Sequence, residues 1–278
     1  MSGNKSALDL ARLLGVAQDA VDIALNELWP ARNQFVHGHP AHPKGDRDFV
    51  TEVDLRIQKR VHQYLNSTTP HIGFLGEESV TEAADPLQND LVWTLDPIDG
   101  TSNFSHGLML CSVSLALLHY GEPVVGITAA KSLDLRYHAT KDGGAFRNGM
   151  PIRVSETTQL NSSLVSTGDY AVGQDASEKN WQRIALTTAL IGKVERIRMF
   201  GAATLDLAFV AEGSTDACIM LSNKPWDTAA GVLLAREAGA LVTDANGTAH
   251  SYSSTATIAA APGISAELLA LVRSAFAK

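Results

Sequence analysis

The sequence predicts a mixed α+β (α/β) protein made of two closely packed halves. Three patterns carry this prediction. Apolar residues recur at helical spacing between positions 10 and 28, and residues 111–132 contain two β-rich runs joined by a turn signal. After about residue 155, strand-like runs alternate with helical ones. We therefore expect an N-terminal α+β half of residues 1–155 and a C-terminal α/β half of residues 156–278.

The N-terminal half is expected to begin with a helix. Its apolar stripe falls at positions 10, 13, 14, 17, 21, 24, 25 and 28. Ser6 and Asp9 resemble a capping box before this stripe, and Pro30 is expected to end the helix. The segment HGHPAHPKGD (37–46) reads as an exposed loop, and a second helix is expected to begin near Thr51.

Strands and further helices follow in order. The strand-like runs of the N-terminal half are residues 71–79, 91–95, 111–120 and 123–132, and Asn148-Gly149 marks a tight hairpin after them. In the C-terminal half, residues 162–168, 216–221 and 257–263 are strand-like. The helical runs there are residues 177–192, 202–213 and 225–240, and a last one that begins at Ser265.

Composition limits the possible functions. The formal net charge is −8 and the pI about 5.5, which argues against a nucleic-acid partner because phosphate backbones need clustered Lys and Arg. No apolar run reaches the length of about 18 residues that spans a bilayer, and Asp9 and Arg12 interrupt any signal-peptide pattern. Cys111 and Cys218 lie in apolar runs and read as buried free thiols. We therefore expect a soluble cytoplasmic protein without membrane contact.

The stretch LDPIDGTSNF (95–104) carries the strongest chemical signal. Asp96 and Asp99 follow a buried apolar run, and the proline and glycine around them restrict the backbone so that both carboxylates can face one place. The Ile98 carbonyl and the Thr101 hydroxyl can face the same side. These are hard oxygen ligands of the kind that Mg²⁺ prefers.

A possible phosphate site follows at once. Gly100, Thr101 and Ser102 lie at an expected helix start, and the first N–H groups of a helix can bind an anion. Metal-binding acids beside such amides indicate hydrolysis of a phosphate ester. Three further acids are candidates for the same site, but each also has a purely structural explanation. Asp54 could form a capping box with Thr51, Glu77 could be a solvated loop acid beside Glu78, and Asp227 could be an acid in the first turn of a helix.

Several motifs resemble those of the inositol monophosphatase family. LDPIDGTSNF, after Trp93, resembles its signature W-x-x-D-P-[IL]-D-G-T-x-N-[FY]. WDTAAGVLLAREAGA (226–240) resembles the second signature, with Ala240 where Gly is usual. DFVTEVD (48–54), GEES (76–79) and GGAFRNGMPIRVS (143–155) match shorter family motifs in family order.

The resemblance implies a layered αβαβα sandwich, a homodimer, and a phosphomonoesterase that uses two or three Mg²⁺ ions to activate water. It implies that the first Mg²⁺ is held by Glu77, Asp96, the Ile98 carbonyl and Thr101, and the second by Asp96, Asp99 and Asp227. A third would rest on Glu77. Thr101, with Asp54 and Glu77, would orient the attacking water, and the Gly100 and Thr101 amides would hold the phosphate.

The alcohol part of the substrate is less defined. Inositol-hydrolysing members have a G-[ST]-A loop and a Glu seven residues before the second-signature Asp, where this chain has Gly201-Ala202-Ala203 and Met220. The expected substrate-binding residues are Gly100, Thr101, Ser102, Gly201, Ala202, Ala203, Met220 and Asp227. We expect inositol 1-phosphate or a related small polyol or sugar phosphate. Histidinol phosphate is the first alternative, followed by fructose 1,6-bisphosphate or a nucleotide 3′,5′-bisphosphate. A non-catalytic binding or regulatory module is the alternative of a different class.

Overall fold

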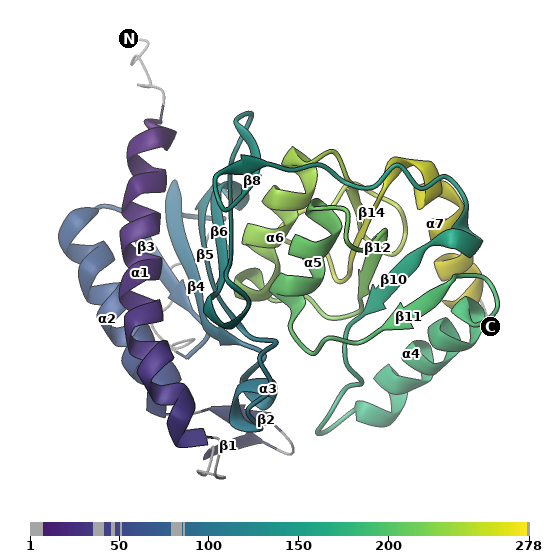
Figure 1. Cartoon of the computed structure of the whole chain (residues 1–278), viewed down its shortest axis with the longest axis horizontal. Helices are drawn as coiled ribbons and strands as arrows, with labels where there is room; N and C mark the ends of the chain where they lie inside the picture. The colour runs from purple at the N-terminus through teal and green to yellow at the C-terminus, as the bar shows by residue number, and fades with distance from the viewer. Residues whose placement is uncertain are drawn as a thin grey trace.

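Five layers make up the molecule (Figure 1). The computed structural model describes residues 8–35, 42–45, 48–50, 52–78, 85 and 87–276. Helices α1 (Leu10–Phe35) and α2 (Glu52–Thr68) cover one face of a seven-stranded sheet, and α5 (Ala203–Ala211) and α6 (Pro225–Glu237) lie between this sheet and a five-stranded one. Helices α4 (Ala176–Leu190) and α7 (Pro262–Phe276) form the last layer. This arrangement confirms the αβαβα prediction.

The seven-stranded sheet has the order β3-β4-β5-β6-β7-β8-β9, and only the β3–β4 pair is parallel. Its strands are β3 (Gly73–Gly76), β4 (Leu91–Asp99), β5 (Ser112–His119), β6 (Glu122–Ala130), β7 (Leu135–Thr140), β8 (Gly144–Arg147) and β9 (Met150–Pro151). Asn148 (φ 49°) and Gly149 (φ 80°) form the predicted tight turn before β9.

The five-stranded sheet has the order β11-β10-β12-β14-β13. Its strands are β10 (Leu164–Thr167), β11 (Arg196–Arg198), β12 (Ala217–Met220), β13 (Leu241–Thr243) and β14 (Thr257–Ala260). Strands β10, β11 and β12 run parallel, and β14 runs antiparallel to β12 and β13. The two sheets thus come from successive parts of the chain, while the division at residue 155 into two halves stays a prediction.

Two local predictions were wrong. Helix α1 continues through Pro30 to Phe35 instead of ending there. A proline removes one helical hydrogen bond, which packing of the flanking turns can outweigh. Part of the expected loop at 37–46 is a strand, β1 (His42–Gly45), which pairs with β2 (Asp48–Val50). Thr51, the expected start of α2, lies outside the described residues.

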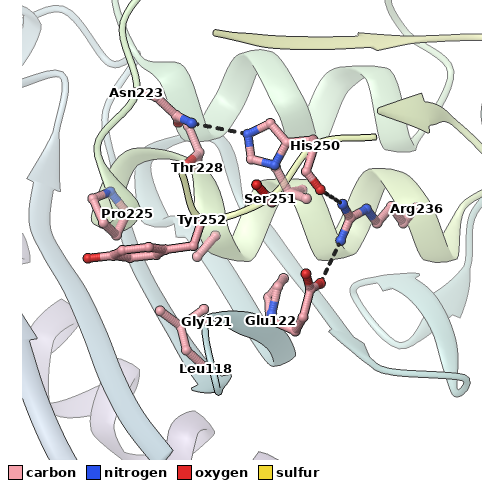
Figure 2. Close-up of a pocket in the computed structure, with 13 residues that line it drawn as sticks. Leu118, Gly121, Glu122, Asn223, Pro225, Thr228, Arg236, His250, Ser251 and Tyr252 are labelled. Carbon is pink, nitrogen blue, oxygen red and sulfur yellow. Dashed lines mark hydrogen bonds and ion pairs between the residues drawn. The ribbon is translucent and has the colours of Figure 1, made fainter. Parts of the chain in front are cut away.

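Helix α6 fits closely into the middle layer because small residues line it. A methyl group added to Gly126 of β6 would lie 3.0 Å from both Cα and the carbonyl oxygen of Ala230. Beyond this contact, α6 borders a small hollow between the β5–β6 turn and the segment before β14 (Figure 2). There, His250 contacts Asn223, and Arg236 pairs with Glu122 at 3.3 Å.

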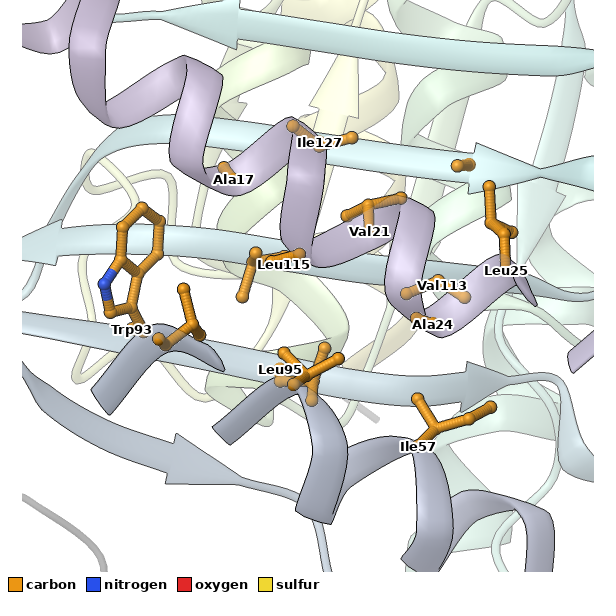
Figure 3. Close-up of a cluster of buried hydrophobic side chains, with 14 of the residues drawn as sticks. Ala17, Val21, Ala24, Leu25, Ile57, Trp93, Leu95, Val113, Leu115 and Ile127 are labelled. Carbon is orange, nitrogen blue, oxygen red and sulfur yellow. The ribbon is translucent and has the colours of Figure 1, made fainter. Parts of the chain in front are cut away.

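The main core lies between α1, α2 and the seven-stranded sheet (Figure 3). The predicted stripe supplies Ala17, Val21, Ala24 and Leu25 of α1, which face Leu115 and other buried strand residues. Trp93 is 1% exposed, and its indole N–H donates to the Thr69 hydroxyl at 3.1 Å. This core fixes β4, the strand that carries the acids of the candidate site. None of the helices in the described part of the chain could span a membrane.

Candidate active site

The end of β4 places the two central acids on one side of the sheet. Strand side chains alternate between faces, so residues three apart would normally point in opposite directions. Here the pairing shifts: Asp96 lies opposite Ser114, whereas Asp99 lies opposite Ser112. Three steps on β4 therefore match two on β5, which is a β-bulge that brings both carboxylates to the same face.

The turn after the bulge positions Thr101. Gly100 has φ 82°, and a methyl group on it would lie 2.8 Å from the Leu110 carbonyl oxygen, so only glycine fits. Helix α3 (Thr101–Ser105) begins directly after it. The Thr101 hydroxyl donates to the Ile98 carbonyl at 2.8 Å and lies 3.5 Å from Oδ1 of Asp54. The hydroxyl thus connects β4 with a buried acid of α2.

Asp99 connects β4 of the seven-stranded sheet with helix α5 of the middle layer. Its carboxylate accepts hydrogen bonds from the Ala203 amide (3.1 Å), the Thr204 amide (2.8 Å) and the Thr204 hydroxyl (2.6 Å). An acid of β4 therefore caps α5, a helix of the middle layer that has no cap of its own. Burial raises the pKa of Asp99 to about 6, and the hydrogen bonds from Thr204 and Ala203 oppose that rise.

Asp96 is the electrostatic centre of the site. Asp96 is 2% exposed, and the backbone amide of Ile98, two residues later, donates a hydrogen bond to its Oδ1 at 2.9 Å. Burial raises the pKa of Asp96 well above its usual value. The charges that raise it further belong to the other four predicted acids: Glu77, Asp99, Asp227 and Asp54. All five acids therefore act on one place, although they come from four separate parts of the chain.

The donor set fits a hard divalent cation. When several negative charges converge on one buried carboxylate, positive charge is needed between them for that carboxylate to remain ionised. The acids of the site lie beside the Ile98 carbonyl and the Thr101 hydroxyl, which are also oxygen donors. In the described part of the chain, no three His, Cys, Asp or Glu side chains are already arranged as a metal-binding group. The fit thus rests on the chemistry of the donors and on their mutual electrostatic effect.

The predicted substrate contacts are placed less uniformly. The loop Gly201–Ala203 lies beside Asp99, as its hydrogen bonds show. Ala202 is 2% exposed and Met220 is 3% exposed, and Met220 packs among apolar residues of the C-terminal sheet. Gly100, Ser102 and Asp227 lie at or near the surface beside the acids. The roles of all these residues stay predictions.

Three residues that position the site were missed by sequence reasoning. Thr204 holds Asp99, as described. Asn103 donates to the carbonyls of Phe200 and Leu110, both at 2.8 Å, and so ties the loop before α5 to α3. Gln58 of α2 accepts a hydrogen bond from the Glu78 amide at 2.9 Å and thereby holds the segment that carries Glu77. Asn103 lies within the quoted motif, but nothing in the sequence shows where Thr204 and Gln58 point.

Known proteins of similar sequence and structure agree on one family. The sequence pattern of the inositol monophosphatase family matches residues 9–276. The inositol-1-monophosphatase ImpA of Mycolicibacterium smegmatis is 35% identical over 270 residues, which cover 96% of this chain and 95% of that protein. The fructose-1,6-bisphosphatase/inositol-1-monophosphatase of Thermotoga maritima is 38% identical over 203 residues, or 73% and 74% of the two chains. The crystal structure of the extragenic suppressor protein SuhB from Bartonella henselae has a TM-score of 0.86 at 30% identity, covering 94% of this chain and 98% of its own.

Proposed function

Because this chain belongs to the inositol monophosphatase family and is a phosphoric monoester hydrolase, we propose that it hydrolyses inositol 1-phosphate or a related small polyol or sugar phosphate with Mg²⁺. The observation that carries the proposal is the effect of four acids on the buried Asp96. Such a cluster repels an anionic phosphate unless cations neutralise it, which is why a metal-dependent reaction suits it.

The residues that would hold the ions are the oxygen donors around Asp96. Glu77, Asp96 and the Ile98 carbonyl would hold one Mg²⁺, with the Thr101 hydroxyl beside them, and Asp96, Asp99 and Asp227 would hold a second. When bound, Mg²⁺ supplies Lewis-acid activation of water and neutralises charge on the phosphate and the departing oxygen.

The chain's own groups would orient the reactants. The Thr101 hydroxyl lies between the Ile98 carbonyl and Asp54, so it would accept a hydrogen bond from the attacking water once its single proton turns from Ile98 to Asp54. Glu77 would accept a proton from the same water. The amides of Gly100, Thr101 and Ser102 at the start of α3 would donate to the phosphate oxygens.

The comparisons support two substrate classes. The Mycolicibacterium relative is named for inositol 1-monophosphate, and the Thermotoga relative for fructose 1,6-bisphosphate as well. We place a polyol or sugar monophosphate first because Ala202 and Met220 do not supply the oxygens expected of an inositol-specific site. Without these side-chain oxygens, the pocket would discriminate less between the alcohol parts of different esters.

Phosphate release from a panel of esters tests the proposal. The panel comprises inositol 1-phosphate, glycerol 2-phosphate, histidinol phosphate, fructose 1,6-bisphosphate and adenosine 3′,5′-bisphosphate. Asp96→Asn should lower kcat/KM at least 1,000-fold, because it removes the negative charge of the one carboxylate that would bind both Mg²⁺ ions. Asp90→Asn, an exposed acid at the start of the same segment, is the matched control.

A readout without turnover completes the test. Addition of Mg²⁺ should raise the thermal unfolding midpoint of the wild type but leave that of Asp96→Asn nearly unchanged. Near-normal activity of Asp96→Asn would overturn the site assignment. No release from any ester by a wild type that Mg²⁺ does stabilise would favour a binding or regulatory module instead.

We further propose a homodimer, on the family resemblance. Leu108 (56% exposed) and Met109 (43% exposed) flank an apolar hollow next to Trp29 and Phe104, which supports burial against a second copy. Light scattering should return twice the chain mass of 29.6 kDa. A monomer at micromolar concentration would contradict this proposal.

A further inference from the structure

A carboxylate outside the set of five lies beside the loop Gly201–Ala203. Asp169 follows β10, two residues after Thr167, the last residue of that strand. A methyl group added to Gly201 would lie 3.5 Å from Oδ2 of Asp169 and 3.1 Å from Nδ2 of Asn103. Asp169 thus borders the loop whose next residues hold Asp99.

The backbone that carries Asp169 is held in place by α4. Arg183, a residue that is 9% exposed, donates through Nε to the Asp169 carbonyl at 3.0 Å. Ala171, two residues after Asp169, is held by the side chain of Asn180. This side chain accepts a hydrogen bond from the Ala171 amide (2.6 Å) and donates one to the Ala171 carbonyl (2.9 Å). Three hydrogen bonds therefore fix this short loop, and a side chain on a fixed loop can select a ligand with little loss of entropy.

The carboxylate itself is left without a partner among the described residues. Arg183 is the nearby cation, but its donors go to the main-chain carbonyls of Asp169 and Lys179. Asp169 remains accessible from solvent. Partial burial raises the pKa of Asp169, because desolvation disfavours the charged carboxylate. The position is therefore ready to accept hydrogen bonds from a bound molecule.

We propose that Asp169 is a specificity-determining residue that binds a protonated amine on the alcohol part of the phosphate monoester. The inference rests on the proposed function, which places the phosphate beside Asp96 and Asp99. Ala202 and the buried Met220 offer no oxygen to the alcohol part, whereas Asp169 offers an ionisable carboxylate next to the same loop. An ammonium group makes short, charge-assisted hydrogen bonds to a carboxylate, and these are stronger than the hydrogen bond from a neutral hydroxyl.

The test uses a matched pair of esters, 3-aminopropyl phosphate and 3-hydroxypropyl phosphate. The wild type should have the higher kcat/KM on the amino ester. Asp169→Asn should lose at least 10-fold on the amino ester and change less than 3-fold on the hydroxyl ester. Asp175→Asn, an exposed acid on the same connection whose left-handed backbone (φ 58°) Asn tolerates, should change neither.

Two results would overturn the inference: equal losses of Asp169→Asn on both esters, or no loss on the amino ester. If the wild type hydrolyses neither of these two esters, the ester panel still decides the proposed function, and binding decides the inference separately. In that case 3-aminopropylphosphonate with Mg²⁺, followed by calorimetry, should bind the wild type at least 10-fold more tightly than Asp169→Asn. Equal affinity would overturn it.

Discussion

Replacement of Asp206 by Asn should stabilise the protein more at high pH than at low pH. Asp206 of α5 is 1% exposed and lies near Cys218, whose strand partner on β10 is Ser166. By strict hydrogen-bond geometry, Oδ1 of Asp206 has no partner among the described residues, although the Ser166 hydroxyl lies close enough to affect its pKa. Burial raises the pKa of Asp206 to about 8; the Ser166 hydroxyl opposes that rise, and the charges of Asp99 and Asp169 add to it.

The sign follows from proton binding. An acid whose native pKa lies above its unfolded value binds its proton more tightly in the native state. The stabilising contribution of Asp206 to the free energy of unfolding is therefore fully present below pH 4 and is lost as the pH rises towards 8. Each pKa unit corresponds to about 1.4 kcal/mol, so the loss between pH 5 and pH 8 is about 4 kcal/mol. Asn keeps the shape of the protonated acid and does not titrate.

Urea unfolding of both proteins in EDTA, at pH 5, 6, 7 and 8, measures the effect. The free energy of unfolding of Asp206→Asn, minus that of the wild type, should grow by about 4 kcal/mol across this range. Asp134→Asn, at an exposed position, should give a constant difference. A difference for Asp206→Asn that stays constant within about 1 kcal/mol would refute the reasoning.

Three further substitutions have expected outcomes. Gly126→Ala should cost about 1–3 kcal/mol in urea unfolding, because its methyl group would press against the α6 backbone at 3.0 Å. Gly15→Ala, in the interior of α1 with nothing within 4 Å of the added methyl, should instead stabilise by about 0.5–1 kcal/mol; destabilisation there would contradict the helix packing described. Thr204→Val removes the hydroxyl that donates to Asp99 at 2.6 Å, so kcat/KM should fall at least 10-fold and more Mg²⁺ should be needed for half-maximal rate. An unchanged Mg²⁺ requirement would show that Asp99 keeps its orientation without Thr204.

Much of the fold could be predicted because its signals are local. The apolar stripe of α1, the Asn148-Gly149 turn and the alternation of strands and helices after residue 155 all act within a few residues. Continuation of α1 past Pro30 could not be predicted, because the packing that outweighs the lost hydrogen bond is tertiary. The layer order came from the family resemblance, since periodicity alone does not say which sheet a helix covers.

The candidate site was predictable in its residue types and less so in its geometry. Asp96 and Asp99 were expected at a turn, but a β-bulge brings them to one face of the sheet. Register shifts depend on the partner strand, which no short motif specifies. Thr204 and Asp169 had no signal at all, because their significance lies in contacts with Asp99 and Gly201 that are far away in the sequence.

The cap that Asp99 provides for α5 makes ligand binding and folding thermodynamically linked. The same carboxylate orders the start of a helix in the middle layer and would lose mobility when a ligand engages it. A ligand at the β4 end should therefore slow hydrogen exchange at the Ala203 and Thr204 amides, on the far side of the carboxylate. Because this coupling is reciprocal, a substitution that destabilises α5 should lower the affinity of the site for that ligand, even where the substituted residue does not contact it.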